Sequence, residues 1–362
     1  MRRFEPSVVW PGVPYALLSA ALFAASIPLA KLLLGGGLSP WLLAGLLYFG
    51  SGLGLGAMWL GRRTVGATTA EAPLRRGDLP WLTLVVLSGG VAGPVLLIIG
   101  LSTTPASTAA LLLNIEGLAT MGIAWLVLRE SVDQRLLLGA ALILTGALLL
   151  SWQEAPGTPG WGALAIFAAC FAWGIDNNLT RKLSGVDPIL VAMTKGLVAG
   201  AVNLAFAIGA GSALPGAMSI VEASAVGFMG YGVSLAFFVL ALRHLGAART
   251  GAYFSTAPFI GAILAVLLLS EPVTVGLITA GLLMAVGLYL HVTELHEHAH
   301  EHQAIEHEHR HVHDEHHAHT HGPSDPPGEP HTHRHRHVPL VHRHPHYPDL
   351  HHRHGHAFFK RG

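Results

Sequence analysis

The chain has 362 residues, of which 51% are hydrophobic and only 12% are charged, and its formal net charge is zero. Soluble globular domains carry about one quarter charged residues, so this composition excludes an ordinary soluble protein. Of the 25 histidines, His244 stands alone and all the others lie between His291 and His356. The chain therefore divides into an apolar body, residues 1–293, and a polar tail, residues 294–362.

The body contains ten long apolar segments in succession. A helix that crosses the hydrocarbon core of a bilayer needs about 20 mostly apolar residues, so we predict ten transmembrane helices in an all-α polytopic membrane protein. The predicted spans are 14–34, 40–60, 79–101, 106–128, 134–152, 161–180, 188–210, 220–242, 250–269 and 272–291. The first span is too long for a cleavable signal peptide, and the lone Cys170 excludes an internal disulfide.

The cations between the spans all fall on one side. The N-terminus and the loops after the second, fourth, sixth and eighth spans carry Arg2, Arg3, Arg62, Arg63, Arg75, Arg76, Arg129, Arg135, Arg181, Lys182, Arg243 and Arg249. The loops after the odd-numbered spans carry no Lys or Arg. Because cytoplasmic loops hold the excess of Lys and Arg, we predict a multi-pass protein of the bacterial plasma (inner) membrane with both termini in the cytoplasm.

The two halves of the body repeat each other. A shift of 148 residues lays the first span over the sixth and matches Pro40 with Pro188, and a shift of 141 lays spans four and five over nine and ten and matches Glu130 with Glu271. Each half has five spans, an odd number, so the second half must run inverted relative to the first. We predict repeats at 1–152 and 153–293, followed by a disordered tail at 294–362. Inverted repeats are typical of secondary transporters, whose substrate site lies near the bilayer midplane.

The motifs LVLRESV and LLLSEPV, at corresponding places in the halves, and the stretch FAWGIDNNLTRKLSGVDP resemble the EamA family of the drug/metabolite transporter superfamily. The resemblance covers residues 14–291 and omits the tail. It implies ten helices around a central cavity and the transport, often the export, of small solutes. One departure is the acid in LLLNIEGLATM, where relatives usually have small, apolar or proline residues.

Glu116 and Asn114 lie near the middle of the fourth span, among Ala, Leu, Gly and Met. An isolated acid at mid-bilayer costs several kcal/mol, so it marks a pathway by default. A carboxylate that faces the two sides in turn suits proton coupling, and with Asn114 or a neighbouring helix it also suits binding a cation. The alternative is a protonated structural Glu within the bundle.

A second polar cluster, Asp176, Asn177 and Asn178, lies in the sixth span, and Lys195 lies at a similar depth in the seventh. An Asp176–Lys195 ion pair is therefore expected, either as a staple between helices or as a gate. Lys31 near the outer end of the first span is a further candidate for transport, or it snorkels to the interface.

Other polar and proline residues in the spans have simpler expected roles. We expect Glu130, Glu271 and Asp187 to cap span ends, and Asn203 to join helices. Proline residues that interrupt helices point to the transport path; they are Pro28, Pro94 and Pro258.

The tail is rich in imidazole, the commonest metal ligand, which favours Zn, Ni and Co. Its candidate metal ligands are His296, His298, His300, His302, His307, His309, His311, His313, His331, His333, His335, His337, His351, His352, His354 and His356. Overlapping ligand sets predict many interchangeable sites. A solvated tail without ligand, a pH-responsive polyelectrolyte and a purification tag are the alternatives.

Together these features predict a secondary active transporter, an exporter, that moves divalent transition metals or is regulated by them. Two alternatives stay open: a metabolite, amino-acid or drug exporter whose tail senses or buffers metal or pH, and a metal-buffering membrane protein without transport. The chain has no GxxxxGK[ST] loop, so we expect no ATP-driven pumping by this chain. We also expect no enzymatic activity and no required cofactor. The expected partners are the lipid bilayer and a small-molecule or metal-ion substrate, with a homodimer as one possible assembly and no nucleic acid.

Overall fold

The computed structural model describes residues 12–64, 74–128, 134–152, 160–183, 186–245 and 247–293 of the body and residues 296–302, 306–311, 331–336 and 340–346 of the tail. The helical elements are α1 (Gly12–Gly35), α2 (Pro40–Thr64), η1 (Arg76–Asp78), α3 (Leu79–Val85), η2 (Val86–Ala92), α4 (Gly93–Thr103), α5 (Ala106–Leu112), α6 (Ile115–Leu128), α7 (Gln134–Trp152), α8 (Trp161–Thr180), η3 (Arg181–Leu183), α9 (Pro188–Gly209), α10 (Ala217–Gly227), η4 (Phe228–Val233), α11 (Ser234–Leu245), α12 (Ala247–Phe254), α13 (Ala257–Leu269) and α14 (Val275–Val292).

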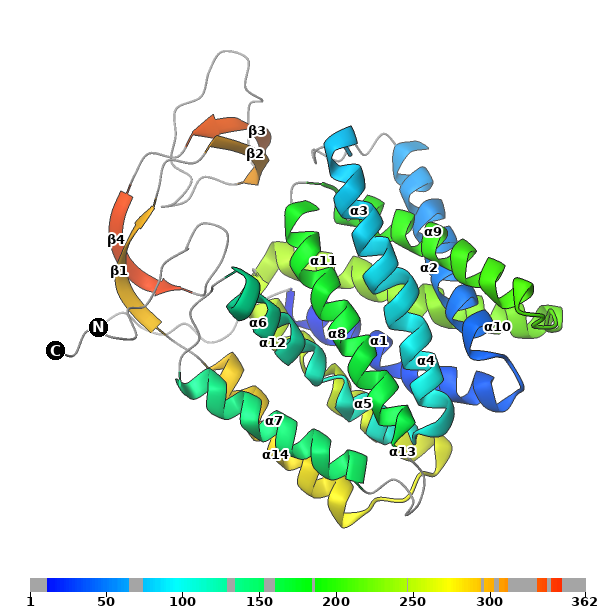
Figure 1. Ribbon diagram of the computed structural model, residues 1–362. Coiled ribbons are helices and arrows are strands. Elements are labelled where there is room, and N and C mark those ends of the chain that lie inside the picture. The colour runs from blue at the N-terminus through cyan, green and yellow to red at the C-terminus, as the bar shows by residue number, and fades with distance from the viewer. Residues whose placement is uncertain are drawn as a thin grey trace.

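These elements form the ten predicted spans. Nine described stretches are helical, long and apolar enough to cross a membrane by length and composition. The tenth, α8, has 20 residues but ends in Asp176, Asn177 and Asn178, which lower its apolar content. It lies within the bundle and packs against α4 and α6 (Figure 1). The prediction of an all-helical body with two inverted five-span halves is confirmed.

Four spans change their helical geometry part-way, at positions related by the repeat. The third span contains the π-helical segment η2 and the eighth contains η4, with Gly89 and Gly230 at positions that the shift of 141 aligns. The fourth span breaks at residues 113–114 and the ninth at residues 255–256. Such irregularities are enriched at functional sites, so both halves have a specialised segment near mid-span.

The prolines explain only part of this pattern. Pro94 opens α4 after η2, and Pro258 lies in the first turn of α13 after the break, as the sequence predicts. The prediction is wrong for Pro28, which lies inside the continuous helix α1. A proline removes one backbone donor, and a helix continues where the surrounding bundle accommodates the freed carbonyl.

Glycines allow the closest helix pairs. A Cβ built on Gly52 of α2 would lie 2.5 Å from the backbone nitrogen of Leu197 in α9, and one on Gly139 of α7 would lie 2.8 Å from the carbonyl oxygen of Gly287 in α14. Small residues let helix backbones approach within a membrane, where van der Waals packing drives association. The pairs α2–α9 and α7–α14 lie at opposite edges of the bundle (Figure 1).

The bundle has two distinct ends. We call the end where α1 begins and α14 finishes the tail end, and the opposite one the far end. The described loops and helix ends at the tail end hold Arg62, Arg63, Arg75, Arg76, Arg135 and Lys182, whereas Lys31 lies toward the far end. The guanidinium of Arg63 lies over the ring of Trp59, 3.9 Å from its centroid, as is common where a helix meets the membrane interface.

The described part of the tail forms two antiparallel strand pairs. Strand β1 (His296–His302) pairs with β4 (Leu340–His346), and β2 (Glu306–His311) pairs with β3 (His331–Arg336). The disorder expected for residues 294–362 is not tested by these four short segments and stays a prediction. Alternating histidines suit extended strands, whose side chains repeat every second residue. A two-stranded pair alone is only marginally stable in water, so these pairs do not amount to a folded domain.

Candidate functional site

Glu116 lies directly after the break in the fourth span. Residues 113–114 form the turn, and Glu116 occupies the first turn of α6, where the helix dipole favours a carboxylate. Its Oε1 accepts a hydrogen bond of 3.0 Å from Nδ2 of Asn177 in α8, and the same nitrogen lies 3.1 Å from Oγ1 of Thr120. A broken helix thus presents an acid to a polar side chain of the neighbouring span.

Of the two companions expected for Glu116, Asn114 or a neighbouring helix, the structure shows the neighbouring helix. Asn114 is buried, and its Nδ2 donates to the carbonyl oxygen of Leu111 at 2.8 Å and lies 3.8 Å from Sδ of Met284 in α14. The structure therefore joins Glu116 to Asn177 and directs Asn114 toward another helix. Asn114 is close in sequence, but its amide bonds the carbonyl oxygen of Leu111 within the turn at residues 113–114.

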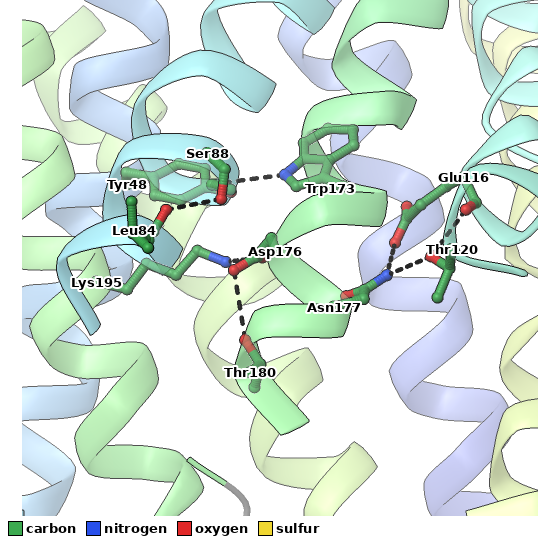
Figure 2. A network of polar contacts seen from close by, with 11 residues as sticks. Tyr48, Leu84, Ser88, Glu116, Thr120, Trp173, Asp176, Asn177, Thr180 and Lys195 are labelled. Carbon is green, nitrogen blue, oxygen red and sulfur yellow. Dashed lines mark hydrogen bonds and ion pairs between the residues drawn. The ribbon is translucent and has the colours of Figure 1, made fainter. Parts of the chain in front are cut away.

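Asp176 and Lys195 form the predicted ion pair between α8 and α9. The side chain of Asp176 is 7% exposed and that of Lys195 is 19% exposed, so the pair is largely withdrawn from solvent. Oδ1 of Asp176 also accepts a bond of 3.4 Å from Thr180. Figure 2 shows Asp176 and Lys195 on one side of α8, and Asn177 with Glu116 on the other.

The π-helical segment η2 makes room for this pair. A Cβ on Gly89 would lie 2.0 Å from Oδ2 of Asp176, so only glycine permits the observed approach. The carbonyl oxygen of Gly89 accepts hydrogen bonds from the hydroxyl of Tyr48 and from Nε1 of Trp173, each at 3.0 Å (Figure 2). Asn203 donates to the carbonyl oxygen of the next residue, Gly90, at 3.3 Å. Side chains of α2, α8 and α9 thus bond one widened turn of the third span.

Sequence reasoning missed this cluster around η2. Tyr48 and Trp173 are ordinary core residues by type, and their shared acceptor arises only when a π-turn frees a backbone carbonyl. The consecutive glycines Gly89 and Gly90 were the available signal, since glycine inside a helix usually has a packing or functional reason.

The remaining candidates hold helix ends or join helices. Nζ of Lys31 donates to the carbonyl oxygens of Leu101 at 2.6 Å and Thr104 at 2.9 Å, so it satisfies the end of α4 at the far end. Asp187 accepts from the backbone nitrogen of Ile189 as the cap of α9. Nδ2 of Asn178 bonds the carbonyl oxygen of Thr120 at 3.0 Å. Glu130 lies outside the described residues.

Glu271 ties the two halves together at the far end. Its carboxylate accepts from the backbone nitrogens of Ala106 at 2.6 Å and Ser107 at 2.8 Å, and from the Ser107 hydroxyl at 2.5 Å. It thereby satisfies the orphan donors at the start of α5. A residue that follows α13 thus caps a helix of the other half, as part of a contact in which α5 packs along α13.

The two ends of the bundle differ although the repeat relates them. At the far end α5 packs along α13. The repeat relates α5 to α12 and α13 to α6, but α6 and α12 at the tail end do not pack in this way within the described residues. Asn177 is exposed although it shares a helix face with the buried Cys170, Trp173 and Gly174. The outward face of α8 carries Trp161 instead, which is 66% exposed. Within the described residues the α5–α13 contact is therefore the more extensive of the two related contacts, and Asn177 is exposed on its side of α8.

The described residues outside the tail strands contain no group of three or more His, Cys, Asp or Glu arranged to hold a metal ion. The predicted metal ligands all lie in the tail. Six of them, His313, His337, His351, His352, His354 and His356, lie outside the described residues, and the others occupy strand positions whose backbone alone is described.

Broken helices, inverted halves and an acid beside the break define a membrane transporter of the secondary type. Residues 10–152 and 160–293 each match the EamA-like transporter family. The chain belongs to this family, with one copy in each half, and the tail lies outside both matches.

Two individual proteins illustrate this relationship. An uncharacterized transporter of Methanothermobacter thermautotrophicus is 31% identical over 229 residues, which span 61% of this chain and 66% of that protein. A protein known from a crystal structure superposes with a TM-score of 0.56 over 77% of this chain and 95% of its own, at 20% identity. The second likeness supports the fold alone.

Proposed function

We propose that the protein is a secondary active exporter of small solutes in which Glu116 couples transport to protons. The observation that carries the proposal is the position of Glu116, in the first turn of α6 beside a mid-span break and bonded to the exposed Asn177. A carboxylate in the membrane takes up and releases a proton more readily when solvent reaches its partner from one side.

The orientation follows from the cations at the tail end. Because cytoplasmic ends hold the excess of Lys and Arg, we assign the tail end to the cytoplasm of a bacterial plasma membrane and the far end to the outside. In this proposal solute reaches Glu116 and Asn177 from the cytoplasm in the inward-facing state, which the α5–α13 contact at the far end supports. To export the solute, α5 leaves α13 and α6 closes toward α12, which exchanges the conformations of the two halves.

Glu116 changes charge within this cycle. The carboxylate accepts the hydrogen bond from Asn177, and protonation converts one of its oxygens into a donor. The neutral form crosses the apolar phase at lower cost, so a proton moves inward as solute moves outward. The stability of the α6–α8 contact thus depends on whether the Glu116 carboxylate is protonated.

The test replaces Glu116 by Gln in purified protein reconstituted into liposomes with an imposed pH gradient. A hydrogen bond to a charged group contributes about 1.5–3 kcal/mol, so we expect gradient-driven flux to fall about 10- to 100-fold and the residual flux to lose its pH dependence. Glu222→Gln is the matched control, since Glu222 is exposed in α10. Unchanged flux and pH dependence in Glu116→Gln would exclude Glu116 as the coupling residue.

A second candidate cargo is a divalent transition metal, favoured by the histidines of the tail. Imidazole binds Zn, Ni and Co, and the tail follows α14 at the end assigned to the cytoplasm. The liposomes are therefore loaded in parallel with Ni²⁺, Co²⁺ or Zn²⁺ and with amino acids. Movement of metal that weakens on removal of residues 294–362 supports metal export. If only an organic solute moves, the result supports a tail that senses or buffers metal. If neither metal nor organic solute moves, the result supports a metal-buffering protein without transport.

A further inference from the structure

The repeat relates two groups of helices within the body. In one group α1 packs against η4, α11, α12 and α13, and in the other α8 packs against α3, η2, α4 and α6. Each group therefore combines the first span of one half with the third and fourth spans of the other half. We call them the α1 group and the α8 group. At the far end they meet where α5, the first part of the fourth span, packs along α13 (Figure 1).

Two charged side chains reach from the α1 group to the corner between α4 and α5. Nζ of Lys31 in α1 donates to carbonyl oxygens of Leu101 and Thr104 at the end of α4. The carboxylate of Glu271, just after α13, accepts from two backbone nitrogens at the start of α5, at 2.6 and 2.8 Å. A cation is favourable at the C-terminus of a helix and an anion at its N-terminus, so each charge suits the helix end that it meets.

The backbone turns sharply to bring Glu271 to this corner. Ser270, which ends α13, has a φ of 53°, the one positive φ among the described residues that are not glycine. A side chain in this left-handed region costs energy and persists where the surrounding structure enforces it, often in segments that switch conformation. The contact between Glu271 and α5 is therefore built at a cost to the local backbone.

The charged bonds are the main polar connection between the two groups. Among the side-chain hydrogen bonds between described residues, only those of Lys31 and Glu271 join the α1 group to the α8 group. The neighbouring contact is between small apolar residues, since a Cβ on Gly261 of α13 would lie 3.1 Å from that of Ala110 in α5. Hydrogen bonds to charged groups are about twice as strong as neutral ones, so these two residues resist separation most.

The related corner at the tail end lacks most of these groups. The repeat places Leu179 where the α1 group has Lys31, and Ala248 where α5 has Ser107, whose hydroxyl also donates to Glu271. Only the acid is kept in the sequence, as Glu130. The two ends are therefore unequal, and the charged contact favours closure at the far end.

We propose that Lys31 and Glu271 form a lock that keeps the far end closed, and that their release from the corner between α4 and α5 opens it. The proposal rests on the proposed function in one respect, that the α5–α13 contact parts during transport. It gives both residues a role in the conformational change instead of in contact with the solute.

The test measures how fast a water-soluble maleimide reacts with a cysteine at the α5–α13 contact, in the full chain purified in detergent. The reporter is Ala110→Cys in a chain with Cys170→Ala, since Ala110 is buried while the groups are in contact. Parallel chains without the reporter keep Cys170, which is buried within the α8 group and reacts only when the bundle unfolds. The assay needs neither solute nor a pH gradient.

We expect Glu271→Gln and Lys31→Met each to raise the reaction rate of the reporter about tenfold or more, the effect of losing a bond to a charged group. The two changes together should exceed either alone. Ser107→Ala removes only the hydroxyl bond to Glu271 and should raise the rate less, and it keeps the test valid if a charge variant fails to fold. Glu222→Gln, at an exposed position of α10, is the matched control and should leave the rate unchanged.

A reporter rate that stays the same in the charge variants, or that rises only as much as the rate of Cys170, would overturn the lock. The same measurements in chains that also carry Glu116→Gln separate this outcome from that of proton coupling. Equal increases in those chains support the lock even if flux shows that Glu116 does not couple transport. Increases that disappear there would assign the effect to Glu116 and overturn the proposal.

Discussion

The ion pair between Asp176 and Lys195 gives the sharpest test of the polar network in the body. Three variants decide its role: Asp176→Asn, Lys195→Met and the two together. The pair joins α8 to α9 against the glycine turn of η2, and its side chains are 7% and 19% exposed. Removing one member of a buried pair leaves the other charge without a partner, whereas removing both leaves a neutral contact.

The magnitudes follow from the burial of each member. Breaking a buried pair costs about 3–5 kcal/mol, and the partial exposure of Lys195 places the loss in Asp176→Asn near the lower limit. Lys195→Met should cost more, since it leaves Asp176, the more buried charge, with only the 3.4 Å bond from Thr180. We expect the double variant to recover to within about 1 kcal/mol of the unmodified protein, because no unpaired charge remains.

The assay is thermal unfolding in detergent, followed by flux in liposomes. A loss of 3 kcal/mol corresponds to a fall of about 5–10 °C in Tm for a chain of this size. Single variants as stable as the unmodified protein, or a double variant no better than Lys195→Met, would refute the reasoning. Flux separates the two roles left open by the sequence. If the double variant is stable and transports, the ion pair only links the two helices. If it is stable but inactive, the ion pair is part of a gate.

Two further predictions concern close approaches between spans. Gly89→Ala places a Cβ 2.0 Å from the carboxylate of Asp176. We therefore expect the free energy of unfolding in detergent to fall by about 1–3 kcal/mol and flux to decrease. An unchanged Tm would show that η2 shifts to accept the methyl group without cost. Ala110→Cys with Gly261→Cys, in a chain with Cys170→Ala, joins α5 to α13, since a Cβ on Gly261 would lie 3.1 Å from that of Ala110. Oxidation should stop flux and reduction should restore it, and flux that persists in fully cross-linked protein would mean that this contact does not open.

The spans and the ion pair could be predicted from sequence because each follows from a one-dimensional rule. Apolar length sets the spans, and residue count from a common surface places Asp176 and Lys195 at similar depth. Both predictions are confirmed by the structure. The rules fail where tertiary contacts decide, as at Pro28, which the surrounding bundle keeps within a continuous helix.

The break beside Glu116 could not be predicted in the same way. No proline or glycine lies at residues 113–114, and the segment reads as continuous helix. The partner of Glu116 comes from α8, 61 residues away, so only the packing of α6 on α8 identifies Asn177. Lys31 likewise needed tertiary information, since its acceptors are carbonyl oxygens at the end of α4.

The repeat makes the position of the charges informative. Glu116 and Asp176 belong to the packed elements α6 and α8, and the related elements of the other half are α13 and α1. At the related positions the chain has Ala257 and Pro28, so the second contact is uncharged. A symmetric scaffold gives two conformations of similar energy, while an asymmetric set of side chains gives them different affinities for the same solute. Since the charged contact lies toward the tail end and the apolar one toward the far end, a solute that leaves Glu116 and Asn177 loses polar partners. Under the proposed coupling, release toward the far end follows once the carboxylate is neutral, and the proton on Glu116 then sets the direction of transport.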